Sequence, residues 1–227
     1  MHILSIGKTF TYDALNIINI SLHELSLHKE LERYDYIIIS GGDGSIRRLM
    51  KQIVTLKKRP KIILNPTGSF NVIAKLHRVP KVEKILQTLA EKKIPNTKPQ
   101  KLYRLNDEIF LFAAGNMGDL QHIFLSETLR FGLLQNGMLK YILAVLFLLP
   151  VHLIMTPFML LSSQRFFIFT PASFIKKFGS FYGEVKEMQI DLENEYNLIE
   201  LDGDIVTVEE SILNIELAGS VEIIGRS

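Results

Sequence analysis

The segment Tyr36–Ser45 (YIIISGGDGS) decides the fold of this chain. Its first half is a continuous apolar run of strand length, which is typical of a strand covered on both faces of a sheet. Gly41–Ser45 (GGDGS) ends that strand. Beyond the loop, apolar residues recur at the i, i+3, i+4, i+7 spacing of a helix with one buried face: Ile46, Leu49, Met50 and Ile53. The segment therefore predicts a buried strand, a glycine loop and a helix.

The same pattern occurs again further along the chain. Lys61–Leu64 (KIIL) is predicted to be a strand, Asn65–Ser69 (NPTGS) its loop, and Met1–Gly7 an earlier strand. Two more helices are expected, one after the second loop and one after Pro80. Their apolar positions are Val72, Ile73 and Leu76 in the first, and Val82, Ile85, Leu86 and Leu89 in the second. Strands that alternate with helices predict a parallel, doubly wound α/β sheet.

The second half of the chain has a different texture. Ile94–Lys101 (IPNTKPQK), with two prolines, is predicted to be a linker, so we divide the chain into domains at 1–98 and 99–227. A hairpin of Leu102–Leu105 and Ile109–Ala114 follows. Further short strands are expected at Arg165–Thr170, Val185–Leu192, Leu198–Leu201, Ser211–Leu217 and Val221–Ile224. These features predict a mostly antiparallel β domain, whose last strands can pack back on the first domain.

Composition narrows the class of protein. With 227 residues, 47% hydrophobic content and a net charge of +2, the chain is not a disordered protein. The absence of Cys excludes a disulfide framework, Cys-rich zinc sites and thiol catalysis, and it suits a reducing compartment. Residues 1–100 carry 17 Lys and Arg against 8 Asp and Glu, and residues 101–227 carry 9 against 16. This asymmetry indicates that the first half handles an anion, although solvated helix faces explain it equally well.

One apolar stretch leaves the relation to the membrane open. From Tyr141 to Ser162 there is no Asp, Glu, Lys or Arg over the length of a membrane span. Pro150 and Pro157 lie inside the stretch, so an unbroken helix is not expected there. A transmembrane span, a surface that contacts the membrane or lines a lipid site, and a buried core segment all remain open. Met1–Gly7 is too short to be a signal peptide.

The glycine loop is the sharpest chemical feature. Its three glycines let the backbone approach a ligand closely, and the N–H groups at the helix start favour an anion. Asp43 repels a phosphate directly, so its carboxylate suits a metal ion or a sugar hydroxyl. The loop is no Walker A motif, and Arg47 occupies the third glycine position of the dinucleotide fingerprint. The alternative is an ordinary glycine turn.

The second loop repeats this chemistry at the next strand end. Thr67 and Ser69 carry hydroxyls, Gly68 permits close approach, and Asn71 opens a helix. Two such loops at neighbouring strand ends are expected to face one crevice, where open α/β sheets bind their ligands. Together the loops predict a site for a phosphate-bearing ligand.

The two loops also carry a family resemblance. GGDGS at Gly41–Ser45, followed by PTGSFNVIAKL from Pro66, resembles the catalytic domain of diacylglycerol kinases and bacterial lipid kinases, in a superfamily shared with NAD kinases. Leu111–Asp119 (LFAAGNMGD) and Leu201–Asp204 (LDGD) are similar to later family segments. The resemblance implies a Rossmann-like nucleotide-binding domain followed by an antiparallel β-sandwich domain, with ATP and Mg²⁺ between them.

The chain also departs from the family pattern. It is shorter than typical bacterial members, Val72 replaces an Asp, and Asp204 replaces a Glu. Arg47 and Arg48 stand where the family has Asn-Glu. Two cations in the first turn of a helix oppose the helix dipole, which predicts an anionic group nearby, although solvated side chains explain the two arginines equally well.

The resemblance implies roles for individual residues. Asp204 would accept the proton of the attacking hydroxyl. Asp43 would order the phosphates and the metal, so Asp43→Asn is expected to be inactive but folded. Asn116 and Asp119 would line the cleft. Without the family, Asp202-Gly203 would simply predict a β-turn. The nucleotide-binding residues implied are Gly41, Gly42, Asp43, Gly44, Ser45, Thr67, Gly68, Ser69 and Asn71.

The predicted function is that of an ATP-dependent lipid kinase that phosphorylates a lipid hydroxyl, such as that of diacylglycerol. The alternatives are an NAD kinase and a non-catalytic nucleotide or lipid sensor. The expected partners are ATP and a lipid substrate. The protein is expected to be cytoplasmic and to make peripheral contact with the inner face of the membrane, and a homodimer is compatible with the sequence. A nucleic-acid partner is not expected, because basic charge is its only support.

Overall fold

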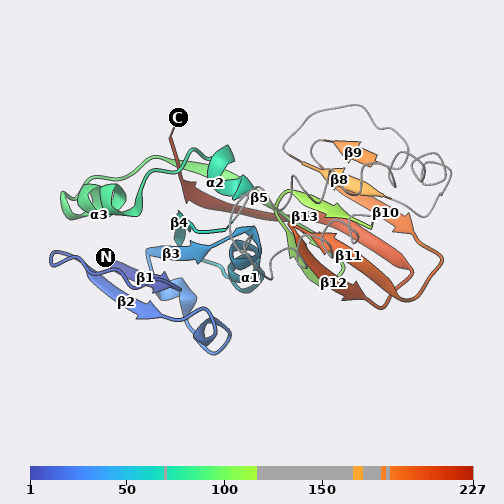
Figure 1. Ribbon diagram of the computed structural model, residues 1–227, viewed down its shortest axis with the longest axis horizontal. Coiled ribbons are helices and arrows are strands. Elements are labelled where there is room, and N and C mark those ends of the chain that lie inside the picture. The colour runs from blue at the N-terminus through green and yellow to red at the C-terminus, as the bar shows by residue number, and fades with distance from the viewer. Residues whose placement is uncertain (69–70, 117–165, 171–179, 183–184, 227) are drawn as a thin grey trace, which may run out of the picture. The chain divides into compact units, whose positions relative to one another are not determined.

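The computed structural model describes residues 1–68, 71–116, 166–170, 180–182 and 185–226 (Figure 1). The chain forms two compact units, each described separately below. Unit 1 comprises Met1–Leu111 and Glu216–Ser227, and unit 2 comprises Phe112–Ile215. The predicted apolar stretch 141–162 lies outside the described residues. Within the described part of the chain, no helix is long and apolar enough to cross a membrane.

Unit 1 is built on a parallel sheet, as predicted. The strands β1 (His2–Ile6), β2 (Asn16–Ile20), β3 (Tyr36–Gly41) and β4 (Lys61–Pro66) lie in the order β2-β1-β3-β4 and pair in parallel. The apolar residues of β3 and β4 are almost fully buried, which agrees with strands covered on both faces. β2 was not predicted from the sequence, because its burial is only partial and its pattern irregular.

The sheet continues with the last strand of the chain. β13 (Ile212–Ile224) pairs in parallel with β4, and the order runs on through β5 (Thr97–Leu105) to β6 (Glu108–Phe110). β10 (Glu187–Asp191) pairs with β13 outside this order. The sequence predicts two strands here, Ser211–Leu217 and Val221–Ile224, where the structure has one.

Gly219 explains why that prediction was wrong. It lies inside β13 with φ +133°, and a Cβ there would stand 2.6 Å from Nη1 of Arg59. Nη1 of Arg59 donates a hydrogen bond to the Ser220 carbonyl at 2.8 Å. The glycine thus serves the close approach of an arginine to a continuous strand rather than a turn.

The predicted linker is also corrected. From Thr97 onward the segment 94–101 belongs to β5, and Pro99 is accommodated there at an exposed position. The predicted hairpin is confirmed where Tyr103 pairs with Phe110 in an antiparallel arrangement. Its second strand ends earlier than predicted, however, because Ala113–Gly115 forms β7 in a different sheet.

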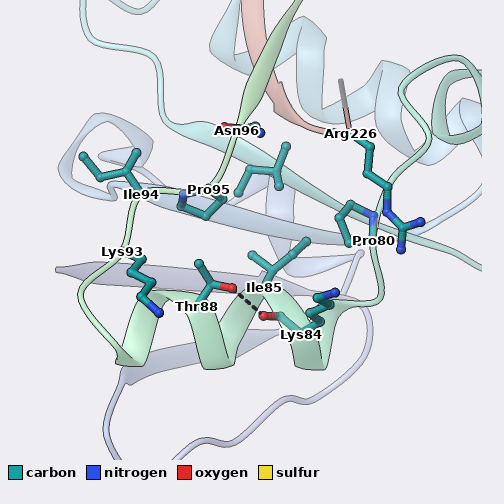
Figure 2. Close-up of a pocket in the computed structure, with 11 residues that line it drawn as sticks. Pro80, Lys84, Ile85, Thr88, Lys93, Ile94, Pro95, Asn96 and Arg226 are labelled. Atoms are coloured by element: carbon teal, nitrogen blue, oxygen red, sulfur yellow. Dashed lines mark hydrogen bonds between the residues drawn. The ribbon is translucent and has the colours of Figure 1, made fainter.

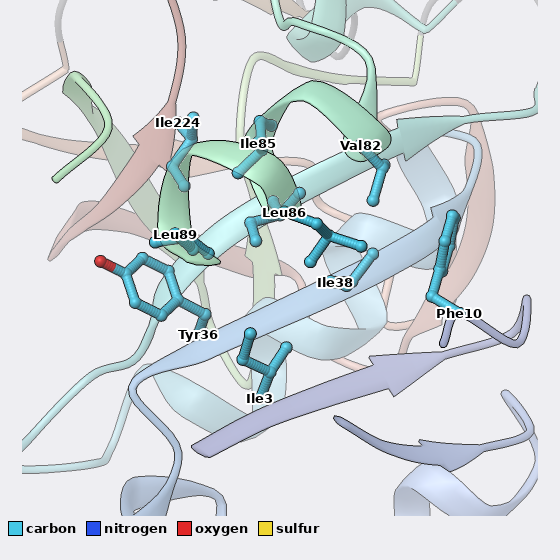
Figure 3. Close-up of a cluster of buried hydrophobic side chains, with 10 residues drawn as sticks. Ile3, Phe10, Tyr36, Ile38, Val82, Ile85, Leu86, Leu89 and Ile224 are labelled. Carbon is cyan, nitrogen blue, oxygen red and sulfur yellow. The ribbon is translucent and has the colours of Figure 1, made fainter. Parts of the chain in front are cut away.

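Three helices accompany the parallel strands. α1 (Asp43–Ile53) and α3 (Val82–Ala90) bury every apolar position predicted for them. α3 packs against Ile3, Ile38 and Ile63 of the sheet, and Figure 3 shows this cluster of side chains. α2 (Val72–Leu76) is a short helix of 5 residues. It buries Ile73, but Leu76 is 45% exposed, contrary to the prediction.

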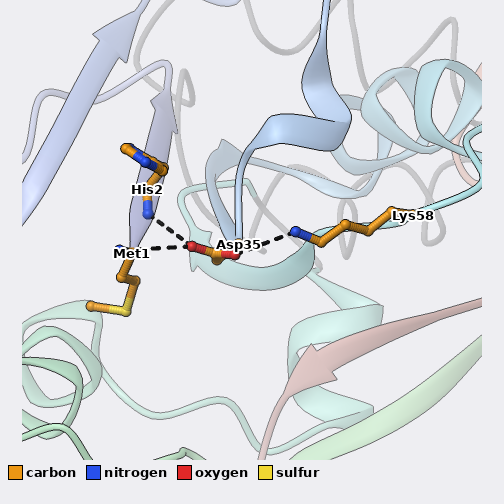
Figure 4. A network of polar contacts seen from close by, with 4 residues as sticks. All are labelled: Met1, His2, Asp35 and Lys58. Carbon is orange, nitrogen blue, oxygen red and sulfur yellow. Dashed lines mark hydrogen bonds and ion pairs between the residues drawn. The ribbon is translucent and has the colours of Figure 1, made fainter.

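The amino ends of three strands are joined by Asp35 (Figure 4). Its Oδ2 accepts a hydrogen bond from the His2 N–H at 2.9 Å, and its Oδ1 lies 3.5 Å from Nζ of Lys58. Its backbone donates to the His2 carbonyl at 2.9 Å and accepts from the Lys61 N–H at 3.0 Å. The hydrogen bond from His2, followed by the charge of Lys58, lowers the pKa of the Asp35 carboxyl against the opposing effect of burial.

Unit 2 contains a separate, mostly antiparallel sheet, which confirms the predicted fold class. Its order is β12 (Asp204–Val208), β11 (Asn197–Leu201), β7, β8 (Phe167–Phe169) and β9 (Ser180–Tyr182). The pairs from β12 to β8 are antiparallel, whereas β8 and β9 are parallel. β8, β10 and β11 lie within or close to predicted strands, and β12 was not predicted.

Candidate functional site

The two loops singled out from the sequence meet at the carboxyl ends of β3 and β4. Gly41 pairs in register with Pro66, and the Thr67 N–H donates to the Gly41 carbonyl at 3.1 Å. A Cβ on Gly68 would lie 2.6 Å from the Cα of Gly42, so a larger residue would push the loops apart. The prediction that neighbouring loops come together is thus explained by a direct backbone contact.

Asp43 holds the second loop in place. It is 8% exposed at the start of α1, and its Oδ2 accepts a hydrogen bond from the Val72 N–H at 2.8 Å. Its Oδ1 accepts from the Ile73 N–H at 3.1 Å. Asn71, the residue before α2, makes no capping side-chain bond to this helix, so the remote carboxylate satisfies the N–H groups that its first turn leaves open.

Burial raises the pKa of the Asp43 carboxyl, and the N–H groups of Val72 and Ile73 and the charge of Lys75 oppose that effect. Each oxygen accepts one N–H, so a lone pair remains on each. Among the described residues no three His, Cys, Asp or Glu gather as a metal site. A carboxylate oxygen with a lone pair is a ligand that Mg²⁺ uses, and a Mg²⁺ bound to phosphates needs only one or two protein carboxylates.

Asn71 shapes the second loop from inside. Its Oδ1 accepts a hydrogen bond from the Gly68 N–H at 3.0 Å, and its Nδ2 donates to the Gly68 carbonyl. Its backbone is left-handed, at φ 50°. The side chain predicted to contact a ligand therefore bonds to its own loop. Ser69, predicted beside it, lies outside the described residues.

The first loop presents backbone donors. The Gly42 carbonyl accepts from the N–H groups of Ser45 and Ile46 at 3.0 and 3.2 Å. Among the described residues, the N–H groups of Asp43 and Gly44 donate no hydrogen bond, as is usual in the first turn of a helix. Open N–H groups at a helix start are the kind of donor that binds anions, and the anion site predicted from the sequence stays a prediction.

Arg47 has an internal partner. Its Nη1 lies 3.0 Å from Oε2 of Glu108, and Nζ of Lys51 lies 2.6 Å from Oε1 of the same carboxylate. Arg47 is buried, whereas Arg48 is exposed. The anionic group predicted near these arginines is thus present in the chain itself, 61 residues from Arg47.

The late Asp-Gly-Asp motif forms a tight hairpin in unit 2. Asp202 and Gly203 both have positive φ between the paired residues Leu201 and Asp204, as a type I′ turn requires. Oδ1 of the buried Asp202 accepts hydrogen bonds from the N–H groups of Phe112 and Ala113, at 2.9 and 3.0 Å.

The turn interpretation is therefore correct for Asp202-Gly203, and it places Asp204 at the start of β12, partly exposed. The anchoring role of Asp202 was missed, because no local pattern links it to a segment 89 residues away. Asn116 belongs to the same unit, and its Oδ1 accepts from the Phe166 N–H at 2.9 Å. Asp119 lies outside the described residues.

This arrangement defines a class of protein: an α/β unit in which two glycine-containing loops meet at the strand ends, and a second unit of mostly antiparallel strands. Residues 13–101 match the diacylglycerol kinase catalytic domain family, so the resemblance seen in the sequence is confirmed. No curated protein sequence matches the chain.

Solved structures show the same fold over the whole length. A diacylglycerol kinase from Bacillus anthracis str. Sterne has a TM-score of 0.56 at 14% identity, covering 99% of this chain and 96% of that one. A putative diacylglycerol kinase from the same organism has a TM-score of 0.53 at 14% identity, with the same coverage of both chains. At this identity the likeness establishes the fold.

Proposed function

We propose that this protein is an ATP-dependent lipid kinase, which transfers the γ-phosphate of ATP to the hydroxyl of a lipid such as diacylglycerol. The observation that carries the proposal is the contact between Gly42 and Gly68, which joins the second loop to the first. In the described part of the chain, the Asp43 and Gly44 N–H groups of that first loop donate no hydrogen bond. It falls within the residues that match the diacylglycerol kinase catalytic domain.

The loops would bind the phosphates of ATP. N–H groups of Asp43 and Gly44 would face phosphate oxygens, assisted by the hydroxyls of Ser45 and Thr67. Mg²⁺ would arrive with the nucleotide and neutralise phosphate charge, with Asp43 as its one protein carboxylate. Because both oxygens of Asp43 bond to α2, this residue acts on the site chiefly by positioning the second loop.

Asp204 is proposed as the general base, following the family resemblance. The lipid hydroxyl oxygen attacks the γ-phosphorus, the bond to the β,γ-bridging oxygen breaks, and ADP leaves. The hydroxyl proton passes to the Asp204 carboxylate. Such transfer depends mainly on positioning and charge neutralisation, so a single base is sufficient.

The lipid acceptor also implies where the protein works. We propose a cytoplasmic protein in peripheral contact with the inner membrane face, which acts as a monomer or a homodimer. Flotation with vesicles and the mass in solution would test these two points.

Label transfer tests the proposed activity. The protein, Mg²⁺ and γ-labelled ATP are incubated with a total lipid extract, and label is sought in the organic phase. Asp204→Asn is expected to reduce transfer by about 10²-fold or more, since general base catalysis typically contributes 10²–10⁴-fold. Glu209→Gln, an exposed charge change just after β12, is the matched control and should retain full transfer.

Other outcomes would redirect the assignment. Label that appears in NADP when NAD is supplied, with none in lipid, would identify an NAD kinase. Binding of ATP without transfer to any acceptor would identify a non-catalytic sensor. Val72 in place of the family Asp favours that alternative, because the second loop has one acidic side chain fewer.

A further inference from the structure

Unit 1 contains a pocket that shares no residue with the glycine loops. Its volume is about 490 Å³, and it lies between α3, the segment 93–96 and the end of β13 (Figure 2). The volume falls within the range of small-molecule sites in proteins. The phosphate chemistry proposed above does not use this pocket.

The charge of the lining has one sign. Lys84, Lys93 and Arg226 contribute to it, and no Asp or Glu does. Within the described part of the chain, Lys84 and Arg226 form no ion pair. Lys93 lies 2.8 Å from Glu91, but both side chains are largely exposed, so this pair is weak and can rearrange. Cations that line one concave space attract an anion.

The backbone that carries Arg226 is fixed. Its N–H donates to the His77 carbonyl at 3.1 Å, and the Gly225 N–H donates to the Asn96 carbonyl at 3.2 Å. A Cβ at Gly225 would collide with the same His77 carbonyl. The Arg226 side chain therefore extends from a backbone in which the N–H groups of both Gly225 and Arg226 are hydrogen-bonded. This arrangement fixes the point from which the exposed Arg226 side chain extends, and its planar fork can bind an anion through two hydrogen bonds.

Most of the remaining wall is apolar, and Thr88 and Asn96 are its polar side chains. Ile85 and Ile224 lie at the base of the pocket and are almost completely buried, whereas Ile94 at the rim is 78% exposed. A bare inorganic ion would leave this apolar surface uncovered. A phosphate group attached to a larger body would cover it.

We propose that this pocket binds a phosphate group carried on an organic body, at a site separate from the nucleotide. Lys84 and Arg226 contact the phosphate oxygens, and the apolar wall contacts the body of the ligand. Two sources share this chemistry, a soluble phosphate ester and the headgroup of an anionic phospholipid. The exposed Lys93 and Ile94 at the rim are compatible with either source.

The test compares two double variants of equal charge. Lys84→Gln/Arg226→Gln removes the two cations proposed to contact the phosphate and leaves Lys93 at the rim. The control Lys81→Gln/Lys92→Gln removes two exposed lysines next to or just beyond α3 that do not line the pocket. Circular dichroism confirms that both fold. Binding is measured by calorimetry with glycerol 3-phosphate, and by sedimentation with phosphatidylcholine vesicles that contain or lack phosphatidylglycerol.

The pocket variant is expected to bind one of these probes about tenfold or more weakly than the unsubstituted protein, since each lost contact is a charge-assisted hydrogen bond. The control should stay within about twofold of the unsubstituted protein. Loss with glycerol 3-phosphate identifies a soluble ester, and loss with phosphatidylglycerol vesicles identifies a headgroup.

Three results would overturn the proposal: no binding of either probe, an equal loss in both variants, or a loss only in Gly68→Ala, which disturbs the glycine loops and leaves the pocket intact. Because neither probe is ATP and no transfer is measured, failure here is distinguishable from failure of the proposed kinase activity.

Discussion

Asp43 contributes both carboxylate oxygens to a helix that begins 29 residues later in the chain. Its position in a glycine-rich loop predicts a ligand-binding acid, but its hydrogen bonds belong to the fold. A substitution there therefore changes the site through the second loop. The expectation that Asp43→Asn would leave the fold intact is revised accordingly.

We expect Asp43→Asn to destabilise the protein by about 1–3 kcal/mol, because the amide replaces one acceptor with a donor and leaves a buried N–H unpaired. Hydrogen exchange at Val72 and Ile73 should accelerate, and ATP binding should weaken with it. Asp13→Asn, the same change at an exposed position, should alter neither. Unchanged exchange at the two amides would show that the carboxylate does not hold α2.

At the scale of elements, Asp35 joins the amino ends of β1, β3 and β4 (Figure 4). Its pKa is lowered in the folded protein, so its contribution to stability is present above the pKa of the unfolded chain, about 3.9. The contribution is lost as the pH falls through the lower folded value. Because the side chain is 40% exposed, the effect is small, below about 1 kcal/mol.

The free energy of unfolding, measured in urea at pH 7 and pH 3, should therefore decrease more with acid in the unsubstituted protein than in Asp35→Asn. The difference between the two proteins isolates this carboxyl from the other acids that titrate in the same range. Asp13→Asn serves again as the control and should follow the unsubstituted protein. If the free energy of unfolding decreased equally in the unsubstituted protein, Asp35→Asn and Asp13→Asn, then Asp35 would not contribute to the pH dependence of stability.

Over the whole molecule, the features that could be predicted from the sequence are those that depend on residues close together in the chain. The apolar faces of α1 and α3 and the two loops follow from local spacing, and the structure confirms them. Contacts over long separations could not be predicted. The ion pair of Arg47 with Glu108 and the contact of Arg59 with Ser220 depend on how distant strands are ordered. The domain boundary after residue 98 stays a prediction.

The order β4-β13-β5 places the end of the chain in the middle of the sheet of unit 1. Residues 1–111 alone would therefore lack a central strand. Ile223 in that strand is 0% exposed and pairs with Ile62 of β4, whereas Ile212 at the other end of β13 is 42% exposed. Replacing each isoleucine by alanine therefore compares a buried and an exposed position of the same strand, so the difference in stability reports the burial of the side chain.

We expect Ile223→Ala to lower the free energy of unfolding by about 2–5 kcal/mol, the usual cost of this truncation in a core. Ile212→Ala should cost less than about 1 kcal/mol, because little buried surface is lost. Urea unfolding monitored by circular dichroism measures both. If both substitutions lowered the free energy of unfolding equally, the buried end of β13 would contribute no more to the stability of unit 1 than its exposed end. If both decreases were small, residues 1–111 would account for the stability of unit 1 without β13.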